Sequence, residues 1–369
     1  MKKVGISTIY TGYNYGSALQ AYATREILRS LGFEGEILKL SGSIVEGRDI
    51  RVNKLTVMAL RSIIHYKAGK QSAQSYRANY RTELSEKTKR LFSNFYSNNI
   101  RPTVISYSEL KRKAHNDEFY AFLCGSDQIW NASSLYVDPF YYLEFAPRNK
   151  RIAFAPSFGR NEIPKYNRSI IYKRIRKIPH LSVRENEGQR IIFNGTGRKA
   201  RVLIDPTLVL SKQEWIESLD IEPYNKDYVL AYFLDEPSNL AKMHLKREIE
   251  NGEKIICIPR RAIAGTMVLD AGPKEFLRLI LSAKRVYTDS FHGTAFSISF
   301  HKDFYSYSRN YGAASDQSSR LISLLDKLDL IERYDPQGKC LIDYSLVDQL
   351  LEKERKASKR YLQKCLNKV

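Results

Sequence analysis

Closely spaced cysteines are missing from this sequence of 369 residues. The four cysteines form no C-x-x-C pair and are far apart, at Cys124, Cys257, Cys340 and Cys365. Neither a zinc knuckle nor a disulfide framework is therefore expected, and such thiols suit a reducing cytosol. No group of residues has the spacing of metal ligands, so we expect no metal cofactor.

Long apolar runs are also missing. No uncharged stretch approaches the ~18 to 20 residues that a membrane-spanning helix needs. The apolar run after Lys2 and Lys3 is too short for the hydrophobic region of a signal peptide, and we interpret it as a first strand. We therefore expect a cytoplasmic protein, either soluble or peripheral at the inner face of the plasma membrane.

Negative charge is scarce relative to positive charge. The sequence has 60 Lys and Arg against 40 Asp and Glu, which gives a formal net charge of +20 at pH 7. This excess indicates an anionic partner, and three classes fit: nucleic acid, a lipid headgroup surface, or a phosphorylated metabolite. Charge alone does not choose among these classes.

Apolar strands alternate with helix-length polar segments along the chain, which indicates α/β structure with parallel sheets. Strands are predicted at 4–9, 119–124, 152–156, 181–184, 202–204, 228–233, 254–258, 285–288 and 303–307. Because the chain exceeds the usual size of one compact domain, the pattern predicts two Rossmann-like lobes with a ligand cleft between them.

A boundary between the lobes is expected near residue 222, where Pro223 and a polar stretch precede the next strand. The first lobe would span 1–222 and carry a basic insertion of solvated helices at about 51–98, interpreted either as scaffold or as a membrane or acceptor surface. The second lobe would span 223–345. A closing helix at 346–369 is expected to pack back on the first lobe.

The first strand and helix enclose a polar turn without the G-x-G-x-x-G fingerprint, so we expect no dinucleotide cofactor. The turn still falls at the edge of the sheet where α/β proteins bind ligands. Asn14, Tyr15 and Gly16 are therefore candidates for contacts with an acceptor.

A second polar segment, 125–131, follows the strand at 119–124 and should emerge at the same edge. Its polar side chains could hold sugar hydroxyls, at Ser126, Asp127, Gln128 and Asn131. Trp130 beside them is typical of carbohydrate recognition but also of protein cores. Asp127 could equally cap the following turn or helix.

Three arginines and an aspartate follow other predicted strands. Arg184 would project into the crevice, where its guanidinium fork suits a phosphate or carboxylate; a surface ion pair with a neighbouring glutamate is the alternative. Arg260 and Arg261 are candidates for the opposite wall. Asp205 is expected to shape the turn that leaves the first lobe.

Of the six histidines, only His292 combines a strand-to-helix turn with small neighbours. The turn lies at the carboxyl end of the strand 285–288 and at the beginning of a helix, a position that favours anions. His292 is therefore placed to move protons. Asp289 would either orient its ring or cap the helix.

Five segments, in this order, resemble the polysaccharide pyruvyl transferase family. They are 14–19 (NYGSAL), 125–131 (GSDQIWN), 182–185 (SVRE), 205–208 (DPTL) and 289–294 (DSFHGT). The resemblance covers roughly residues 4–333. It implies a fold like that of two-lobed GT-B glycosyltransferases. It also implies transfer of a pyruvyl group from phosphoenolpyruvate, as co-substrate, onto two hydroxyls of one sugar.

The resemblance further implies roles for single residues. Arg184 matches the family's donor-binding arginine, and His292 matches the histidine that protonates the donor's methylene carbon. Several relatives have an arginine where this chain has Ser290, so another cation must replace it. Candidates are Arg260, Arg261, Arg309 and Arg320; the backbone amides near Gly293, beside Phe291, are the alternative.

The acceptor implied is a bacterial surface or exopolysaccharide precursor, and the positive charge suggests one linked to a lipid diphosphate at an anionic membrane. Two other readings stay open. One is a GT-B glycosyltransferase that uses a nucleotide sugar, since fold alone does not separate the two. The other is a basic RNA-binding protein, although no ribonucleoprotein-like aromatic motif is present and we expect no nucleic-acid partner.

Overall fold

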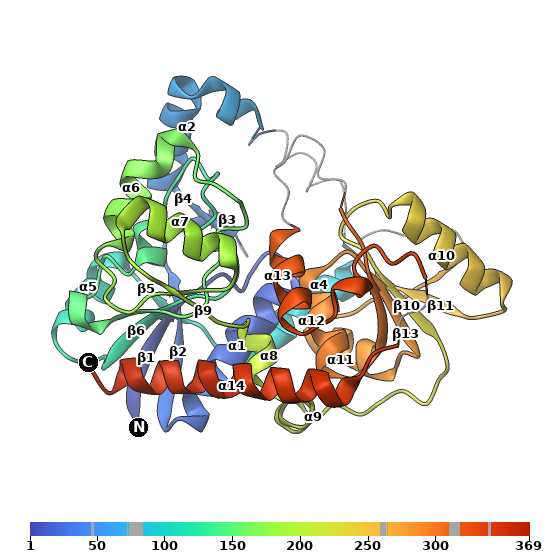
Figure 1. The fold of residues 1–369 in the computed structure, drawn as a ribbon. Helices are drawn as coiled ribbons and strands as arrows, with labels where there is room; N and C mark the ends of the chain where they lie inside the picture. Colours follow the sequence, from blue (N-terminus) through green and yellow to red (C-terminus); the bar gives the residue numbers. More distant parts are fainter. Residues whose placement is uncertain are drawn as a thin grey trace.

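The computed structural model describes residues 1–45, 48–71, 73, 84–258, 263, 265–309, 318–338 and 341–369. These residues form two α/β lobes that lie side by side, with one long helix running along both (Figure 1). Arg260 and Arg261, two predicted ligand contacts, lie outside the described residues.

The first lobe is built on a parallel five-stranded sheet with the order β5-β2-β1-β6-β7. The strands are β1 Lys2–Ser7, β2 Phe33–Leu40, β5 Thr103–Ile105, β6 Ala121–Cys124 and β7 Arg151–Ala153. The central strand β1 pairs with β2 and β6, and its apolar residues Val4 and Ile6 are fully buried. Parallel sheets covered on both faces need such continuous apolar strands.

The second lobe repeats this plan, with the parallel order β12-β11-β10-β13-β14. Its strands are β10 Val229–Tyr232, β11 Ile255–Cys257, β12 Met267–Val268, β13 Arg285–Thr288 and β14 Asp303–Ser306. In both sheets the chain order reverses beside the central strand, and ligands of α/β proteins bind at this switch point. The predicted pair of Rossmann-like lobes is confirmed, and the architecture is GT-B-like.

Helices and short strands complete the fold. In the first lobe they are α1 Tyr15–Ser30, β3 Ser43–Val45, β4 Arg48–Arg51, α2 Val52–Ile64, α4 Glu86–Phe95, the π-helix Tyr96–Ile100, α5 Tyr107–His115, the 3-10 turns Pro139–Tyr142 and Arg148–Lys150, α6 Lys165–Ile175, β8 Ser182–Val183, α7 Asn186–Thr196, β9 Arg201–Val202, α8 Pro206–Val209 and α9 Lys212–Leu219. In the second they are α10 Asn239–Glu250, α11 Pro273–Ser282, α12 Phe291–Ser299, α13 Ser319–Lys327, the 3-10 turn Ile331–Arg333 and α14 Tyr344–Leu366.

The two lobes share one continuous apolar core. Tyr15, at the beginning of α1, stacks on Phe276 of α11 with a ring-centroid distance of 4.6 Å. Its hydroxyl donates to the carbonyl of Ala271 at 2.9 Å. Buried aromatic pairs contribute about 0.5–1.5 kcal/mol beyond their burial, so the lobe junction is held by packing as well as by the connecting chain.

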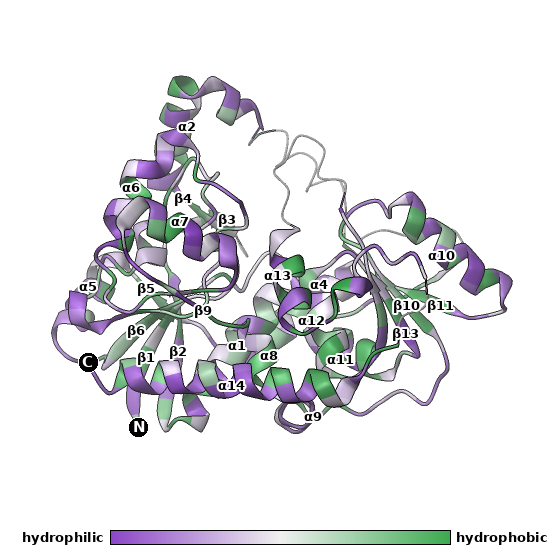
Figure 2. Cartoon of the chain, in the orientation of Figure 1, coloured by the Kyte–Doolittle hydropathy of each residue, from purple (hydrophilic) through white to green (hydrophobic). Residues whose placement is uncertain are grey.

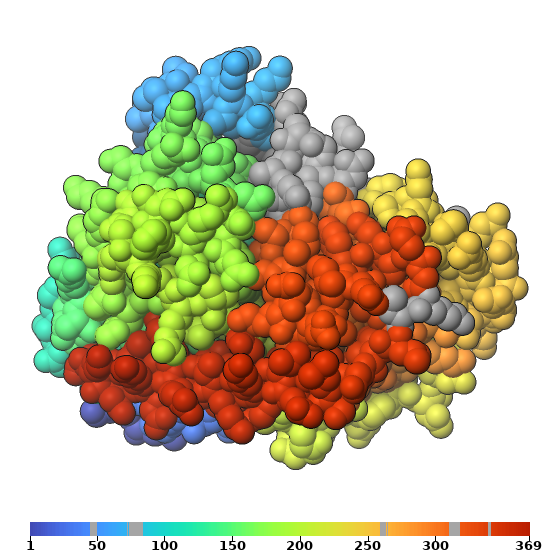
Figure 3. Space-filling view, viewed as in Figure 1, coloured from blue at the N-terminus to red at the C-terminus, as the bar shows by residue number. Residues whose placement is uncertain are grey.

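Helix α14 returns from the second lobe to the first, along the lower edge of both (Figure 3). Tyr361 donates to the carbonyl of Ala153 at 2.9 Å, and Tyr120 donates to the carbonyl of Leu366 at 2.8 Å. Tyr344 at the start of the helix donates to the carbonyl of Lys302 at 2.5 Å, so α14 bridges the two lobes.

The two described halves of the basic insertion differ. Helix α4 buries Phe92 and Phe95 and packs against α1 and α11, so it belongs to the core and is not a solvated helix. Helix α2 buries none of its residues. No helix in the described part of the chain is both long and apolar enough to cross a membrane.

Candidate active site

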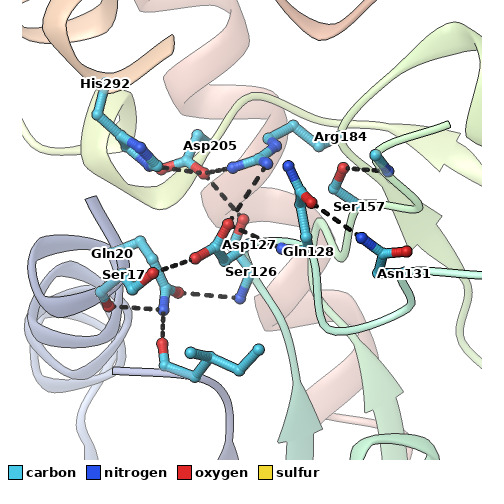
Figure 4. Close-up of polar contacts among 12 residues, drawn as sticks. Ser17, Gln20, Ser126, Asp127, Gln128, Asn131, Ser157, Arg184, Asp205 and His292 are labelled. Atoms are coloured by element: carbon cyan, nitrogen blue, oxygen red, sulfur yellow. Dashed lines mark hydrogen bonds and ion pairs between the residues drawn. The ribbon is translucent and has the colours of Figure 1, made fainter. Parts of the chain in front are cut away.

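A cluster of buried polar side chains lies where the lobes meet, and Figure 4 shows its members pointing toward one another. Arg184 follows β8, and Asp205 caps α8 at its N-terminus. His292 belongs to the first turn of α12, which follows β13. The first two come from one lobe and the third from the other, so the cluster forms only when the lobes are together.

Asp205 is the centre of the cluster. Its Oδ2 accepts from Arg184 Nη1 at 2.5 Å and from Ser126 Oγ at 2.9 Å, and lies 3.9 Å from His292 Nε2. Its Oδ1 accepts from the backbone and hydroxyl of Thr207. Burial alone would raise the pKa of Asp205, but its charged and hydrogen-bonding neighbours, Arg184 first, outweigh burial and lower it to about 2. The carboxylate is therefore ionised at neutral pH.

Arg184 is a buried cation, and some of its N–H groups have no acceptor. Burial opposes its charge, but Asp205 and then Asp127 more than compensate, so its pKa is raised. Nη2 lies 3.8 Å from Asp127 Oδ1, and the guanidinium carbon lies 4.6 Å from the centre of the Phe291 ring. Both Nε and Nη2 are shielded from solvent and lack a hydrogen-bond partner. The predicted alternative, a surface ion pair with a glutamate, is wrong because the arginine is buried and pairs with Asp205.

His292 is 8% exposed, and its Nε2 has no hydrogen-bond partner. Burial lowers the pKa of the ring, while Asp205 and Asp127 act in the opposite direction. The ring packs against the first turn of α1 at Gly16, where a Cβ would stand 1.8 Å from His292 Nδ1. Gly16 therefore has a structural reason to be glycine: it makes room for the imidazole.

Asp127 connects the cluster to α1. Its Oδ2 accepts from Ser17 Oγ, and its Oδ1 accepts from the backbone of Gln128 at 2.8 Å. Ser126, the preceding residue, donates its backbone N–H to Gln20 Oε1 at 3.1 Å. The predicted acceptor residues Ser126 and Asp127 thus lie in the same cluster as the predicted donor arginine.

Gln20 is a member that sequence analysis missed. It is fully buried, and its Nε2 donates to Thr8 Oγ1 at 2.9 Å and to the carbonyl of Ile9 at 2.7 Å. The signal was a glutamine among apolar neighbours on the inner face of a predicted helix. Such a residue must find partners inside the protein.

Glu185 is a second buried carboxylate near the cluster. Its Oε1 accepts from Ser157 Oγ at 3.0 Å and from the backbone of Phe158 at 2.8 Å, whereas Oε2 has no hydrogen-bond partner. Ser157 in turn donates its backbone N–H to the carbonyl of Asp127 at 2.8 Å. These contacts hold the 125–131 turn against the segment that carries Arg184.

The predicted donor residues around His292 lie close together. Ser290 caps α12 by accepting from the backbone of Gly293 at 3.3 Å, so this amide is already engaged. The guanidinium carbons of Arg184 and Arg320 lie 4.6 Å and 6.0 Å from the centre of the Phe291 ring.

Arg320 is one of the cations predicted to take the place of an arginine at Ser290, and it lies near the Phe291 ring. It is buried, and burial followed by the charge of Arg184 lowers its pKa to about 10, while Glu185 and Asp127 oppose this. It therefore remains a cation at neutral pH. Arg309 instead pairs with Asp289, with its Nε 3.4 Å from Asp289 Oδ2.

The structure corrects the role predicted for Asp289. Its two oxygens accept from the backbones of Leu234 and Asp235 at 2.7 and 3.0 Å, which ties the end of β13 to the end of β10. Burial raises the pKa of Asp289, against the effect of Arg309. The carboxylate that faces His292 is Asp205 instead.

The other predicted acceptor residues make structural contacts. Asn14 caps α1 by accepting from the backbone of Ser17 at 3.1 Å, and Tyr15 belongs to the lobe junction. Trp130 is fully buried and donates to the carbonyl of Tyr141 at 2.9 Å, so it is a core residue.

Gln128 and Asn131 are hydrogen-bonded to each other at 3.2 Å. Both are only partly buried. They border the turn that carries Asp127, at the side of the cluster that solvent can reach.

Arg184 and His292 themselves are almost closed to solvent, with exposed fractions of 5% and 8%. A cavity of about 50 Å³ lies at the carboxyl ends of β1 and β2, lined by Thr8, Ile9, Tyr10, Thr11, Leu38, Lys39, Leu40, Ser43, Phe140 and Tyr141. A larger one, of about 450 Å³, lies between α1 and α9. Neither is lined by Arg184 or His292. No group of three or more metal-ligating side chains occurs in the described ranges.

Comparison with known proteins shows which family this sequence matches. Residues 14–311 match the sequence profile of the family described as polysaccharide pyruvyl transferase. A search of curated proteins found no match.

Several solved structures are similar in fold. A UDP-GlcNAc 2-epimerase from Neisseria meningitidis, bound to UDP-GlcNAc, has 9% identity and a TM-score of 0.46 over 100% of this chain and 95% of that one. The glycosyltransferase SnogD from Streptomyces nogalater has 11% identity and a TM-score of 0.40, over 97% of this chain and 95% of that one. A UDP-GlcNAc 2-epimerase from Methanocaldococcus jannaschii has 12% identity and a TM-score of 0.40, over 95% of this chain and 98% of that one.

Proposed function

The chain belongs to the polysaccharide pyruvyl transferase family, and on that premise we propose that it moves the pyruvyl group of phosphoenolpyruvate onto two hydroxyls of one sugar. The product is a cyclic ketal, and phosphate is released. The acceptor we propose is a bacterial surface-polysaccharide, exopolysaccharide or capsule precursor carried on a lipid diphosphate.

Arg184 carries this proposal. Two of its buried nitrogens lack hydrogen-bond partners, and leaving a buried donor unsatisfied costs about 1–3 kcal/mol. An anion that accepts from these groups recovers that cost. Phosphoenolpyruvate offers both a phosphate and a carboxylate, and a guanidinium fork binds either in bidentate geometry. Arg320, which lies near the same Phe291 ring, supplies a second cation for the other anionic group.

His292 is the proposed general acid. Its proton goes to the methylene carbon C3 of the donor, which becomes a methyl group and leaves an oxocarbenium-like centre at C2. One sugar hydroxyl adds to C2, and the second displaces phosphate. Of the two hydroxyl protons, one returns to the imidazole and the other leaves with phosphate, so the reaction balances.

The charges around His292 favour this role once donor is bound. Burial lowers the pKa of the His292 imidazole, so the ring is mainly neutral near pH 7. A phosphate and a carboxylate beside it would favour the imidazolium form, which Asp205 also stabilises at 3.9 Å. Asp127, the cluster carboxylate that keeps some exposure, is placed to relay to the departing phosphate the hydroxyl proton that leaves with it.

Access to the site requires movement. Arg184 and His292 are 5% and 8% exposed, so a donor enters only if the lobes or the side chains above it separate. Because His292 and Asp205 come from different lobes, closure would then assemble the acid beside its carboxylate and exclude water.

Phosphate release from phosphoenolpyruvate tests the proposal. We expect release that depends on added acceptor, and a ~100- to 10,000-fold lower kcat in His292→Ala with a nearly unchanged KM for the donor. Arg184→Ala should instead raise KM for the donor as well. His301→Ala, just beyond the end of the same helix, is the matched control and should keep full turnover.

Thermal shift with candidate ligands separates the competing functions. Phosphoenolpyruvate should raise Tm, because a ligand that binds only the folded protein stabilises it. Stabilisation by UDP- or GDP-sugars with no response to phosphoenolpyruvate would instead favour a glycosyltransferase. Near wild-type turnover in His292→Ala would contradict the assigned chemistry.

A further inference from the structure

Helix α2 has its polarity reversed relative to an ordinary surface helix. A helix at a protein surface normally turns its apolar face to the core, but none of the residues of α2 is buried. Most of its large apolar side chains are exposed; the most exposed are Ile63 and Ile64, at 77% and 72%. Other exposed apolar side chains on this helix and just after it are Val52, Leu55, Val57, Leu60 and Tyr66.

The less exposed face of α2 carries mainly polar residues, with Met58 among them, and it is anchored to the lobe. Arg61 donates to the carbonyl of Leu135 at 3.0 Å and to the carbonyl of Tyr166 at 2.9 Å. His65 stacks on the Tyr166 ring with a centroid distance of 5.0 Å, and Lys54 lies 6.0 Å from the centre of the Tyr136 ring. These contacts hold the helix in place, so its apolar face is presented by the fold rather than by a loose segment.

The charge around this face has one sign. Between residues 52 and 71 there is no Asp or Glu, whereas four basic residues occur: Lys54, Arg61, Lys67 and Lys70. Lys67 and Lys70 are exposed directly beside the apolar face. An apolar stripe flanked by lysines is the pattern of a helix that lies in the interface of an anionic bilayer.

We propose that α2 docks this protein onto an anionic membrane surface, with its apolar face among the lipid acyl chains and the lysines at the headgroups. A second copy of the chain is a less suitable occupant of this face, because two chains of net charge +20 repel each other. Negative lipid headgroups attract that charge, which is why the membrane is the occupant that the observations favour.

The position of α2 suits this role. It stands at the top of the first lobe, on the side of the molecule opposite α14 (Figure 1), and Figure 2 shows hydrophobic turns along it. Its 13 residues are too few to span the hydrocarbon core, which needs about 20, so α2 would lie parallel to the surface. Docking would hold the first lobe, which carries Asp127, near acceptors carried by lipids. That last link rests on the proposed function, but the docking itself does not.

Vesicle co-sedimentation of the full chain tests the docking. We expect binding to vesicles that contain phosphatidylglycerol and much weaker binding to pure phosphatidylcholine. The double variant Ile63→Gln/Ile64→Gln should bind at least roughly tenfold more weakly, because two apolar anchors are lost. Lys67→Gln/Lys70→Gln should lose about fivefold per charge, and salt should remove this difference.

A matched control and an oligomer measurement complete the test. Ile249→Gln, at an exposed site on α10 of the other lobe, should bind vesicles like the wild type. Circular dichroism should show that all variants stay folded, since the substituted side chains are exposed. Equal binding to both lipids, or a wild-type dimer that Ile63→Gln/Ile64→Gln turns into a monomer without any lipid binding, would overturn the proposal. Phosphate release by the soluble protein is independent of these outcomes.

Discussion

Each lobe buries an aspartate beside an arginine near the lobe interface, but the two pairs have opposite electrostatics. In the first lobe the pKa of Asp205 is lowered to about 2, and its partner Arg184 keeps two N–H groups without acceptors. In the second lobe burial raises the pKa of Asp289, whose oxygens are occupied by two backbone amides and by Arg309.

The difference shows how one pair can bind a ligand while the other shapes the fold. Asp289 joins the ends of β10 and β13, as a structural carboxylate does at a strand end. Asp205 instead holds a guanidinium that still has donors to offer, and it does so within reach of an imidazole. Perturbed groups with unfilled hydrogen bonds indicate a functional site.

Removing each carboxylate's charge gives the largest contrast between the pairs. Asp205→Asn leaves the Arg184 cation buried without its main partner, so we expect the free energy of unfolding to fall by ~3–5 kcal/mol. Asp289→Asn leaves one backbone amide without an acceptor, so we expect the free energy of unfolding to fall by about 1–3 kcal/mol. Urea unfolding measures both losses.

Activity provides the control for this comparison. Asp289→Asn should keep phosphate release within a few-fold of wild type, because the residue does not contact His292. Asp205→Asn should lose most of it even at temperatures where the variant is folded. Equal losses of stability and activity in the two variants would mean that the pairs do not differ in role.

Strand ends were predictable from the sequence, but partners across the fold were not. The unit β13 to α12 was predicted at the right residues because a short strand around Val286 and Tyr287 ends in a turn with the helix-capping Ser290. Arg184 and His292 were identified from such placement. Asp205 lies 3.9 Å from His292 although the two are far apart in sequence and in different lobes. No spacing rule reveals a contact of that kind.

Strands with mixed polarity were harder to predict. β2 was missed because Glu34 and Glu36 interrupt its apolar pattern; it forms through pairing with β1, with Ile37 opposite Ile6. The reversed polarity of α2 also escaped prediction. Sequence gives the apolar stripe, but whether that stripe faces the core depends on what the fold places beneath it.

A smaller effect is expected from Gly16, which lets the first lobe approach the second-lobe histidine. In Gly16→Ala the new Cβ would collide with His292 Nδ1, at 1.8 Å, so the ring must shift. A displacement on the order of 1 Å can cost ~100-fold in rate. We expect kcat to fall by about this factor while KM for phosphoenolpyruvate changes little, as stopped-time phosphate assays would show. Unchanged kcat would mean that the imidazole position is not critical.

Acid titration gives the smallest and most specific contrast between the pairs. Because the folded pKa of Asp205 is about 2 against an ordinary 3.8, its ionised form stabilises the fold above pH 4, and ~2 kcal/mol is lost as pH falls toward 2. Asp289 has a raised folded pKa, so its contribution is present below 3.8 and is lost as pH rises. Between pH 6 and pH 2 the unfolding free energy of Asp205→Asn should therefore lose this decrease toward low pH, whereas Asp289→Asn should keep it. The reverse assignment would show that the carboxylate beside His292 is not held in its charged form by Arg184.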